Sequence, residues 1–190
     1  MPIYNKRIYI PKYPRPRSGG GIKSHKTRGY VPRNGIWEEK MTAIKELGSE
    51  SLRQIIDFDK LCFPTDFWKE EDWKDLLADK RSVYYALTDN DNIVGDVFIY
   101  NWKGENDYVK IMNIAVHPDY RKQGLAHKLL DHVTEEMKKQ GMKRFCGETR
   151  NSNEAMRKVF EDCGYVLNKI EDGYYKNPDE SARKYVLQLR

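Results

Sequence analysis

Hydrophobic positions from Trp37 onward recur with helical or strand spacing and divide this part of the chain into elements. Between Leu52 and Cys62 apolar side chains return every three or four residues, which predicts an amphipathic helix that ends near Phe63-Pro64. Thr65-Asp66 predicts the cap of a second helix, with apolar positions at Trp68, Trp73, Leu76 and Leu77. The body of the chain is therefore predicted to begin with two helices.

Strand-like runs occupy the middle of the chain. Residues 83–88 and 93–100 are rich in β-branched and aromatic side chains, and the polar residues 89–92 between them predict a hairpin. A third run, residues 108–116, becomes strongly β-branched towards its end. These runs predict a sheet in the centre of the sequence.

The last third of the chain alternates helices and strands. One helix carries its apolar side chains on a single face and ends at Gly141; these side chains are Leu125, Leu129, Leu130, Val133 and Met137. A short strand is predicted over residues 145–149. Asn151 or Ser152 then caps a helix that ends at Gly164 and buries Met156, Val159, Phe160 and Cys163.

Two strands, residues 165–170 and 183–189, are predicted to close the chain around a polar loop, residues 171–181. Helices and strands thus alternate through the whole body. The pattern predicts a mixed α/β domain over residues 37–190, with a mixed sheet and helices on both faces.

The first 36 residues form a separate basic arm, rich in Pro, Gly and Tyr, which is predicted to be partly disordered. The arm contains nine Lys or Arg and no acidic residue, whereas the rest of the chain has 25 basic and 29 acidic side chains, a net charge of −4. Two interpretations remain open. The arm could bind RNA, a ribosome or another polyanion, or it could be a tail without a partner.

Cysteine spacing and hydropathy limit the class of protein. The three cysteines are widely spaced and lack any CxxC or Cys/His spacing, so we expect free thiols and no metal site. We find no signal peptide and no apolar run of about 18 residues, so we expect a cytoplasmic protein without a membrane partner.

The stretch from Asn113 to Ala126 carries the strongest chemical signal. It is typical of a buried strand, a Pro turn and a short basic loop that opens directly into a helix. The first N–H groups of a helix have no partner within it and carry the positive end of its dipole, so they suit a pyrophosphate. Gly124 would let the backbone approach such a ligand closely. The loop therefore predicts a nucleotide-cofactor enzyme.

The motifs resemble those of the Gcn5-related N-acetyltransferase (GNAT) superfamily from about Leu52 to the C-terminus. Arg121-Lys122-Gln123-Gly124-Leu125-Ala126 matches the family's acyl-CoA loop, Gln/Arg-x-x-Gly-x-Gly/Ala. The nearest groups are the RimI-type ribosomal-protein enzymes and other N-terminal protein acetyltransferases. Further support comes from Cys62-Phe63-Pro64, residues 113–120, residues 148–153 and Gly173-Tyr174-Tyr175.

The resemblance implies a central, mostly antiparallel twisted sheet that is splayed where acetyl-CoA binds. The backbone of one strand would pair with the pantetheine arm, and the loop's N–H groups would wrap the pyrophosphate. Asn153 would bind the cofactor further along. The residues expected at the cofactor are Ile114, Ala115, Val116, Lys122, Gln123, Gly124, Leu125, Ala126, His127, Asn153 and Phe160.

By the same resemblance, Glu148 lies beside the acceptor amine and acts as general base, directly or through one water. A main-chain N–H of the strand before the loop would stabilise the oxyanion. RimI-type enzymes have a proton-donating Tyr where this chain has Phe160, which cannot donate. The thiolate could leave unprotonated, Tyr174 or Tyr175 could supply the proton, or activity could be weak; we favour the first.

Tyr174 and Tyr175 are expected to grip the first residues of the acceptor. Arg150 is expected to form a salt bridge or helix cap, with contact to the substrate as the alternative. The acceptor favoured by the resemblance is the α-amine of a protein N-terminus, such as that of a ribosomal protein. Two alternatives remain: another amine (a small molecule, a lysine or an aminoacyl-tRNA), or a catalytically weak RNA- or ribosome-binding module.

Overall fold

The computed structural model describes residues 44–64, 66–105 and 107–190, so the predicted arm and its boundary with the body lie outside the described residues. The described part contains seven strands and four α-helices. In chain order the elements are β1 Lys45–Leu47, η2 Ser49–Ser51, α1 Leu52–Cys62, α2 Glu70–Ala78, β2 Ser82–Asp89, β3 Asn92–Asn101, β4 Val109–Val116, η3 Pro118–Tyr120, α3 Leu125–Lys139, β5 Arg144–Arg150, α4 Glu154–Asp162, β6 Val166–Tyr175 and β7 Glu180–Gln188.

All seven strands belong to one sheet, in the order β1-β2-β3-β4-β5-β7-β6. Every neighbouring pair is antiparallel except β4 and β5, which are parallel. This arrangement confirms the predicted mixed α/β class with a mostly antiparallel sheet. It also places the single parallel pair in the middle of the sheet.

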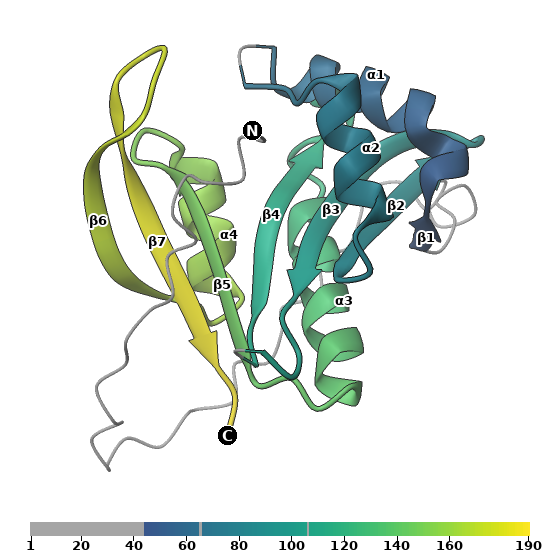
Figure 1. The fold of residues 1–190 in the computed structure, drawn as a ribbon. Coiled ribbons are helices and arrows are strands. Elements are labelled where there is room, and N and C mark those ends of the chain that lie inside the picture. The colour runs from purple at the N-terminus through teal and green to yellow at the C-terminus, as the bar shows by residue number, and fades with distance from the viewer. Residues whose placement is uncertain (1–43, 65, 106) are drawn as a thin grey trace. The chain divides into compact units, whose positions relative to one another are not determined.

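β4 and β5 separate soon after they meet. They pair at Val109–Phe145 and Lys110–Cys146, and no later β4–β5 pair occurs among the described residues. β4 nevertheless stays paired with β3 as far as Val116. Figure 1 shows the two strands close together at one end and apart at the other. We call this divergence the fork; it is the splay that the family resemblance implied.

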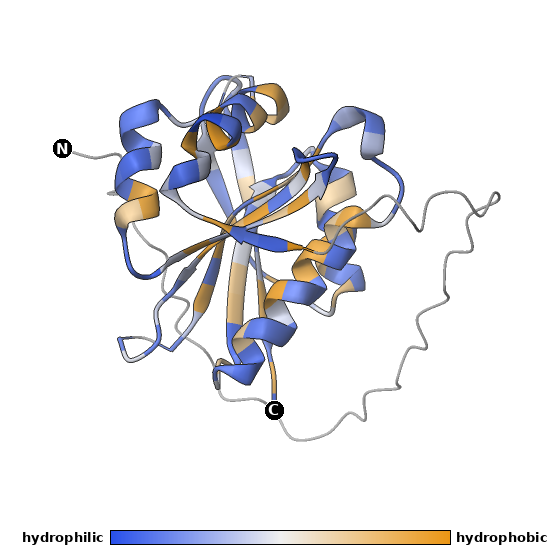
Figure 2. Cartoon of the chain, turned by 90° about the vertical axis from the view of Figure 1, so that its right-hand side faces the viewer, coloured by the Kyte–Doolittle hydropathy of each residue, from blue (hydrophilic) through white to orange (hydrophobic). Residues whose placement is uncertain are grey.

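Helices cover both faces of the sheet around the fork. The apolar stripe of α3 packs on β3 and β4, and its five predicted core residues are all buried. On the other face α1 and α2 pack on β3 and β2, where Trp73 of α2 meets Phe98 with ring centroids 5.3 Å apart. Figure 2 shows hydrophobic residues in the central strands and both kinds of residue along the helices. Helices thus pack against both faces of the sheet, α3 on one face and α1 and α2 on the other.

The helix predicted at residues 52–62 is confirmed, as are the hairpin at residues 89–92 and the helix ends at Gly141 and Gly164, which both have positive φ angles. The predicted cap at Thr65-Asp66 is wrong: α2 begins at Glu70, where the Asp72 carboxylate accepts the Lys69 N–H at 3.1 Å. Asn153, rather than Asn151 or Ser152, caps α4.

The polar loop predicted at residues 171–181 is also wrong in extent. β6 continues to Tyr175 and β7 begins at Glu180, with Glu171 opposite Ala182 and Tyr175 opposite Glu180. Polar side chains are tolerated there because β6 is an edge strand and most of its residues are exposed. This extension brings the end of β6 towards β5 and the fork. β1, which is a strand of only three residues, was not predicted from the sequence.

Candidate active site at the fork

Backbone groups of β4 face the fork from alternate residues. The Ala115 N–H donates to the Asp96 carboxylate at 2.9 Å, and the His117 N–H donates to the Val94 carbonyl at 2.9 Å, so these residues face β3. Successive residues of a strand present their N–H and C=O groups to opposite edges. Ile114 and Val116 therefore face the fork. The Val116 carbonyl already accepts a bond from Arg121 Nε at 3.1 Å.

The loop before α3 has the backbone of an anion site. Lys122 and Gly124 have positive φ angles of 62° and 77°, and α3 then begins at Leu125 without a side-chain cap. A Cβ added to Gly124 would meet no atom within 4 Å. Gly124 therefore borders open space, and the N–H groups that follow it are uncapped by any side chain at the positive end of a 15-residue helix, which fits a diphosphate.

Side chains of the loop take separate roles. Lys122, Gln123 and Gly124 are exposed, whereas Leu125 is buried and anchors the helix start in the core. His127 Nε2 lies 3.2 Å from the Asp162 carboxylate of α4. That the backbone of this loop, more than its side chains, holds the phosphates stays a prediction.

Two other predicted cofactor residues have clear structural roles. Asn153 Oδ1 accepts the Met156 N–H at 3.0 Å and so caps α4. Phe160 is buried and stacks on Tyr185 with centroids 5.1 Å apart. Its ring lies against Gly147, the residue before Glu148. Contact of either residue with a cofactor stays a prediction.

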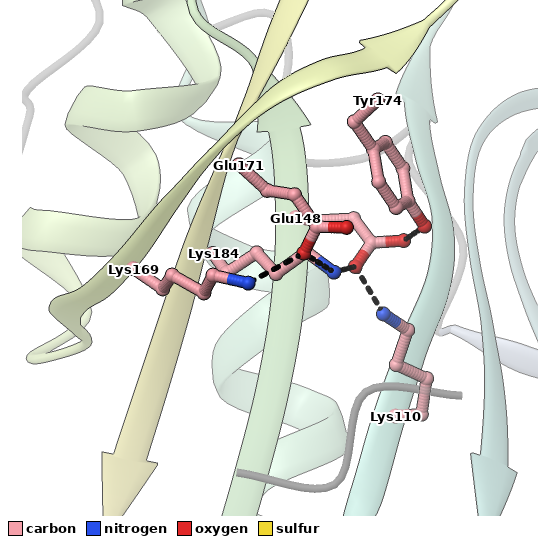
Figure 3. A network of polar contacts seen from close by, with 6 residues as sticks. All are labelled: Lys110, Glu148, Lys169, Glu171, Tyr174 and Lys184. Carbon is pink, nitrogen blue, oxygen red and sulfur yellow. Dashed lines mark hydrogen bonds and ion pairs between the residues drawn. The ribbon is translucent and has the colours of Figure 1, made fainter. Parts of the chain in front are cut away.

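Glu148 lies on β5 and is held by groups from three other strands (Figure 3). Its Oε2 lies 2.6 Å from Lys110 Nζ of β4 and 3.9 Å from Lys184 Nζ of β7. Its Oε1 accepts a bond of 2.5 Å from the Tyr174 hydroxyl of β6. The side chains are largely buried, with 18% of Glu148, 15% of Lys110 and 4% of Lys184 exposed.

These partners decide the charge of the carboxyl. Burial by itself would raise the pKa of Glu148, but the Lys110 charge, the hydrogen bonds from Lys110 and Tyr174, and the Lys184 charge together lower it. Burial and then the Glu148 charge raise the pKa of Tyr174 well above its ordinary value. The site therefore holds an ionised carboxylate beside a protonated phenol.

The sequence prediction missed the two lysines of this network. Lys184 also lies 3.1 Å from the Glu171 carboxylate and 4.4 Å from the centroid of the Tyr174 ring. A lysine among the apolar residues of the last strand is the signal that could have revealed it, because charged side chains are rarely buried without a partner. Lys110 gives no such signal, since it occupies one of the β4 positions that alternate with fully buried ones.

Arg150 is a salt-bridge residue, as predicted. Its Nη2 lies 3.1 and 2.8 Å from the two Asp66 carboxylate oxygens, and its Nη1 lies 3.6 Å from Glu180. The guanidinium also lies 4.5 Å from the centroid of the Tyr175 ring, which contacts Tyr174 edge-on. Arg150 thus connects the α1–α2 segment to the β6–β7 hairpin that bears both tyrosines.

Other classes of site are not found in the described part of the chain. There, no group of three or more His, Cys, Asp or Glu could hold a metal ion. Cys62, Cys146 and Cys163 are free. Among the described residues we also find no helix that combines the length and apolar character needed to cross a membrane.

Comparison with known proteins places this geometry in a family. The sequence profile of the Acetyltransferase (GNAT) family matches residues 50–165, which contain β4, the loop, α3 and Glu148. The chain belongs to the GNAT acetyltransferase family. The acyl donor of this family is acetyl-CoA, and the uncapped start of α3 and the open space at Gly124 fit its diphosphate.

Several curated relatives are N-acetyltransferases by name. The chain is 38% identical over 83 residues to the "[Ribosomal protein bS18]-alanine N-acetyltransferase" of Escherichia coli K12. The aligned segment covers 44% of this chain and 56% of that protein. The chain thus spans just over half the length of that relative. It is 30% identical over 105 residues to "N-alpha-acetyltransferase 30" of Schizosaccharomyces pombe, covering 54% of this chain and 69% of that protein.

Solved structures share the fold. The Escherichia coli ribosomal-protein-S18-alanine N-acetyltransferase superposes with a TM-score of 0.70 at 26% identity, over 77% of this chain and 93% of that one. A GNAT family acetyltransferase from Elizabethkingia anophelis, solved with acetyl-CoA bound, has a TM-score of 0.64 at 22% identity, over 80% of this chain and all of that one.

Proposed function

We propose that this chain is an acetyl-CoA-dependent N-acetyltransferase that acetylates the α-amine of a protein N-terminus, as on a ribosomal protein. The names of the relatives support this acceptor. The observation that carries the proposal is the Glu148 carboxylate at the fork, between Lys110 and Tyr174. This carboxylate would serve as the general base, on the strand across the fork from the β4 edge that fits the acyl donor.

Acetyl-CoA would supply a thioester, whose carbonyl an amine can attack. The backbone N–H groups of residues 122–127 would hold the diphosphate, and the fork-facing backbone of Ile114 and Val116 would orient the pantetheine arm. A fork-facing N–H of β4 would also stabilise the oxyanion, because backbone donors already fixed by a sheet need no reorganisation.

The lowered pKa of Glu148 favours an α-amine over a lysine as acceptor. A carboxylate with a lowered pKa is a weak base, so it needs an acceptor that is easily made neutral. An α-amine has an ordinary pKa of about 7.7–8.0 and a lysine about 10.4, so at neutral pH the neutral fraction of the α-amine is larger by more than about 10²-fold. Glu148 then has only to accept a proton during attack.

The leaving thiolate needs no acid from the chain. Phe160 is buried in the core and cannot donate, and the hydroxyl of Tyr174 is engaged by Glu148. An ordinary thiol has a pKa of about 8.5, so a thiolate is a moderate leaving group at neutral pH. We therefore propose that coenzyme A departs unprotonated.

An acceptor panel tests the proposal. Purified chain and acetyl-CoA are incubated with peptides that begin with Ala, Ser or Met, with a lysine peptide whose N-terminus is blocked, and with a polyamine. Mass spectrometry should show the free-α-amine peptides turning over at least about tenfold faster than the other acceptors. Faster turnover of the polyamine or the lysine peptide would show that the acceptor is not a protein N-terminus. No turnover of any acceptor, with acetyl-CoA shown to bind, would refute the proposed acetyltransferase function.

The basic arm supports a partner for the enzyme. Nine cationic residues and no acid within residues 1–36 favour binding to a polyanion such as ribosomal RNA. Deleting residues 1–36 should abolish salt-sensitive RNA binding while peptide acetylation continues. Equal RNA affinity of the full and shortened chains would exclude this role.

A further inference from the structure

The amine nearest to the proposed base belongs to the chain itself. Lys110 Nζ lies 2.6 Å from Glu148 Oε2, within hydrogen-bonding distance, and is 15% exposed. A general base must lie at this distance, or one water away, from the amine that it deprotonates. Lys110 is also the last residue of β4 that pairs with β5, so its side chain starts where the fork opens.

The second lysine at Glu148 is less well placed. Lys184 Nζ lies 3.9 Å from Glu148 Oε2, but 3.1 Å from the Glu171 carboxylate. It also lies over the ring of Tyr174 and is 4% exposed. Figure 3 shows Lys110 and Lys184 approaching the carboxylate from different strands. Geometry therefore distinguishes Lys110 from its neighbour.

We propose that Lys110 is a self-acetylation site: in the presence of acetyl-CoA its Nζ takes the acetyl group within the same molecule. The inference rests on the proposed acetyl-transfer function, and it adds an acceptor that the chain carries. A lysine is neutral more than about 10²-fold less often than an α-amine, but fixed placement of two reacting groups contributes effective molarities of about 10⁵ M or more. Placement of the thioester carbonyl beside Nζ where the fork opens would outweigh this protonation penalty.

The bonds and protons of the reaction balance. The Lys110 ammonium first loses one proton to solvent, and the neutral Nζ attacks the thioester carbonyl. The N–C bond forms, the C–S bond breaks, and coenzyme A leaves as the thiolate. The second Nζ proton passes to Glu148, which returns it to solvent. The product is an Nε-acetyl-lysine at position 110.

Acetylation would also change the base. It removes the charge of Lys110, so Glu148 keeps the Tyr174 hydroxyl and the more distant Lys184. The pKa of Glu148 should rise as a result, since the Lys110 charge is the largest of the influences that lower it. In a self-acetylated enzyme Glu148 would be a stronger base, and the Lys110 ammonium would no longer compete with the acceptor amine for its carboxylate.

Mass spectrometry of the chain tests the site. The full chain is incubated with acetyl-CoA over pH 7–9, digested, and acetylation at each lysine is quantified. Lys139 is the matched control, because its Nζ also lies 2.6 Å from a glutamate, Glu136, but on the helix surface with 68% exposed. Lys110 should be acetylated at least about tenfold faster than Lys139, at a rate independent of protein concentration.

Three variants, and a measurement of the Glu148 pKa in the cofactor-free protein, complete the test. Glu148→Gln should slow acetylation of Lys110 by about 10²-fold and leave Lys139 unchanged. In desalted protein, ¹³C NMR should show a higher pKa for Glu148 in the self-acetylated chain and in Lys110→Gln than in Lys110→Arg. Circular dichroism confirms that each variant folds.

The outcomes separate this inference from the proposed function. Equal rates at Lys110 and Lys139, or Lys110 acetylation that survives Glu148→Gln, would overturn self-acetylation. If peptides are acetylated in the same tubes while Lys110 stays unmodified, the inference fails and the proposed function stands. If Lys110 is modified in a Glu148-dependent way and no peptide is, the inference stands and the proposed acceptor fails.

Discussion

Gly147 directly precedes Glu148 on β5, and its surroundings allow the packing of the fork to be tested. A Cβ added there would lie 2.6 Å from Phe160 Cζ, 2.8 Å from Phe160 Cε1 and 3.3 Å from Ile111 Cβ. Phe160 has little room to retreat, because its buried ring stacks on Tyr185 at an interplanar angle of 15°. A methyl group at position 147 must therefore move the ring or the strand.

Inserting a methyl group into a packed core costs about 1–3 kcal/mol. For a domain of this size the melting temperature should fall by about 2–12 °C. Gly147→Ala should show this loss in thermal and denaturant unfolding. Gly95→Ala on β3 is the matched control: its added Cβ would meet Leu129 Cδ1 at 3.1 Å, the end of a flexible side chain, so a smaller loss is expected.

Phe160→Leu removes the two ring atoms that the new methyl group would strike. In the double variant with Gly147→Ala, the loss of unfolding free energy should therefore be smaller than the sum of the two single losses, by about 0.5–3 kcal/mol. If Gly147→Ala unfolds within about 0.5 kcal/mol of the wild type, or if the two losses simply add, the packing argument is refuted.

Three further predictions concern the loop, the leaving group and a buried acid. Gly124→Ala should weaken acetyl-CoA binding about tenfold by calorimetry, whereas Gly141→Ala, with a similar φ at the other end of α3, should lose stability alone. Phe160→Tyr should change kcat less than about tenfold, and a larger gain in initial rate would show that the thiolate needs an acid. Burial raises the pKa of Asp96 from 3.8 to about 7, so its stabilising contribution is complete below pH about 4 and lost as pH rises through about 7. Asp96→Asn should remove this slope, worth up to about 4 kcal/mol, from urea unfolding at pH 4 and pH 8; a parallel change of both proteins with pH would contradict it.

The elements with local signals could be predicted from the sequence. α3 has an apolar stripe, a glycine before its start and a glycine after its end, so its place and buried face follow from residues within one segment. The position of Glu148 in the site followed from the family motifs. β6 could not be predicted beyond Ile170, because the polar side chains that follow are held by pairing with β7 rather than by their own pattern.

The environment of Glu148 could not be predicted for a related reason. Lys110 and Lys184 precede and follow it by 38 and 36 residues, and they meet it because β4, β5 and β7 are neighbours in the sheet. A linear pattern carries no information on such cross-strand partners. The consequence is chemical: the sequence suggested a lone glutamate base, and the structure shows an ion-paired carboxylate whose pKa is lowered.

The turnover rate of the Glu148→Gln variant tests most directly the central claim that Glu148 is the general base. Wild type and variant are compared with acetyl-CoA and an Ala-leading peptide, with acetyl-CoA affinity measured separately by calorimetry. We predict that kcat falls about 10²–10⁴-fold while the affinity for acetyl-CoA is kept. Unchanged kcat in a folded variant that binds acetyl-CoA would contradict the assignment of Glu148 as the general base.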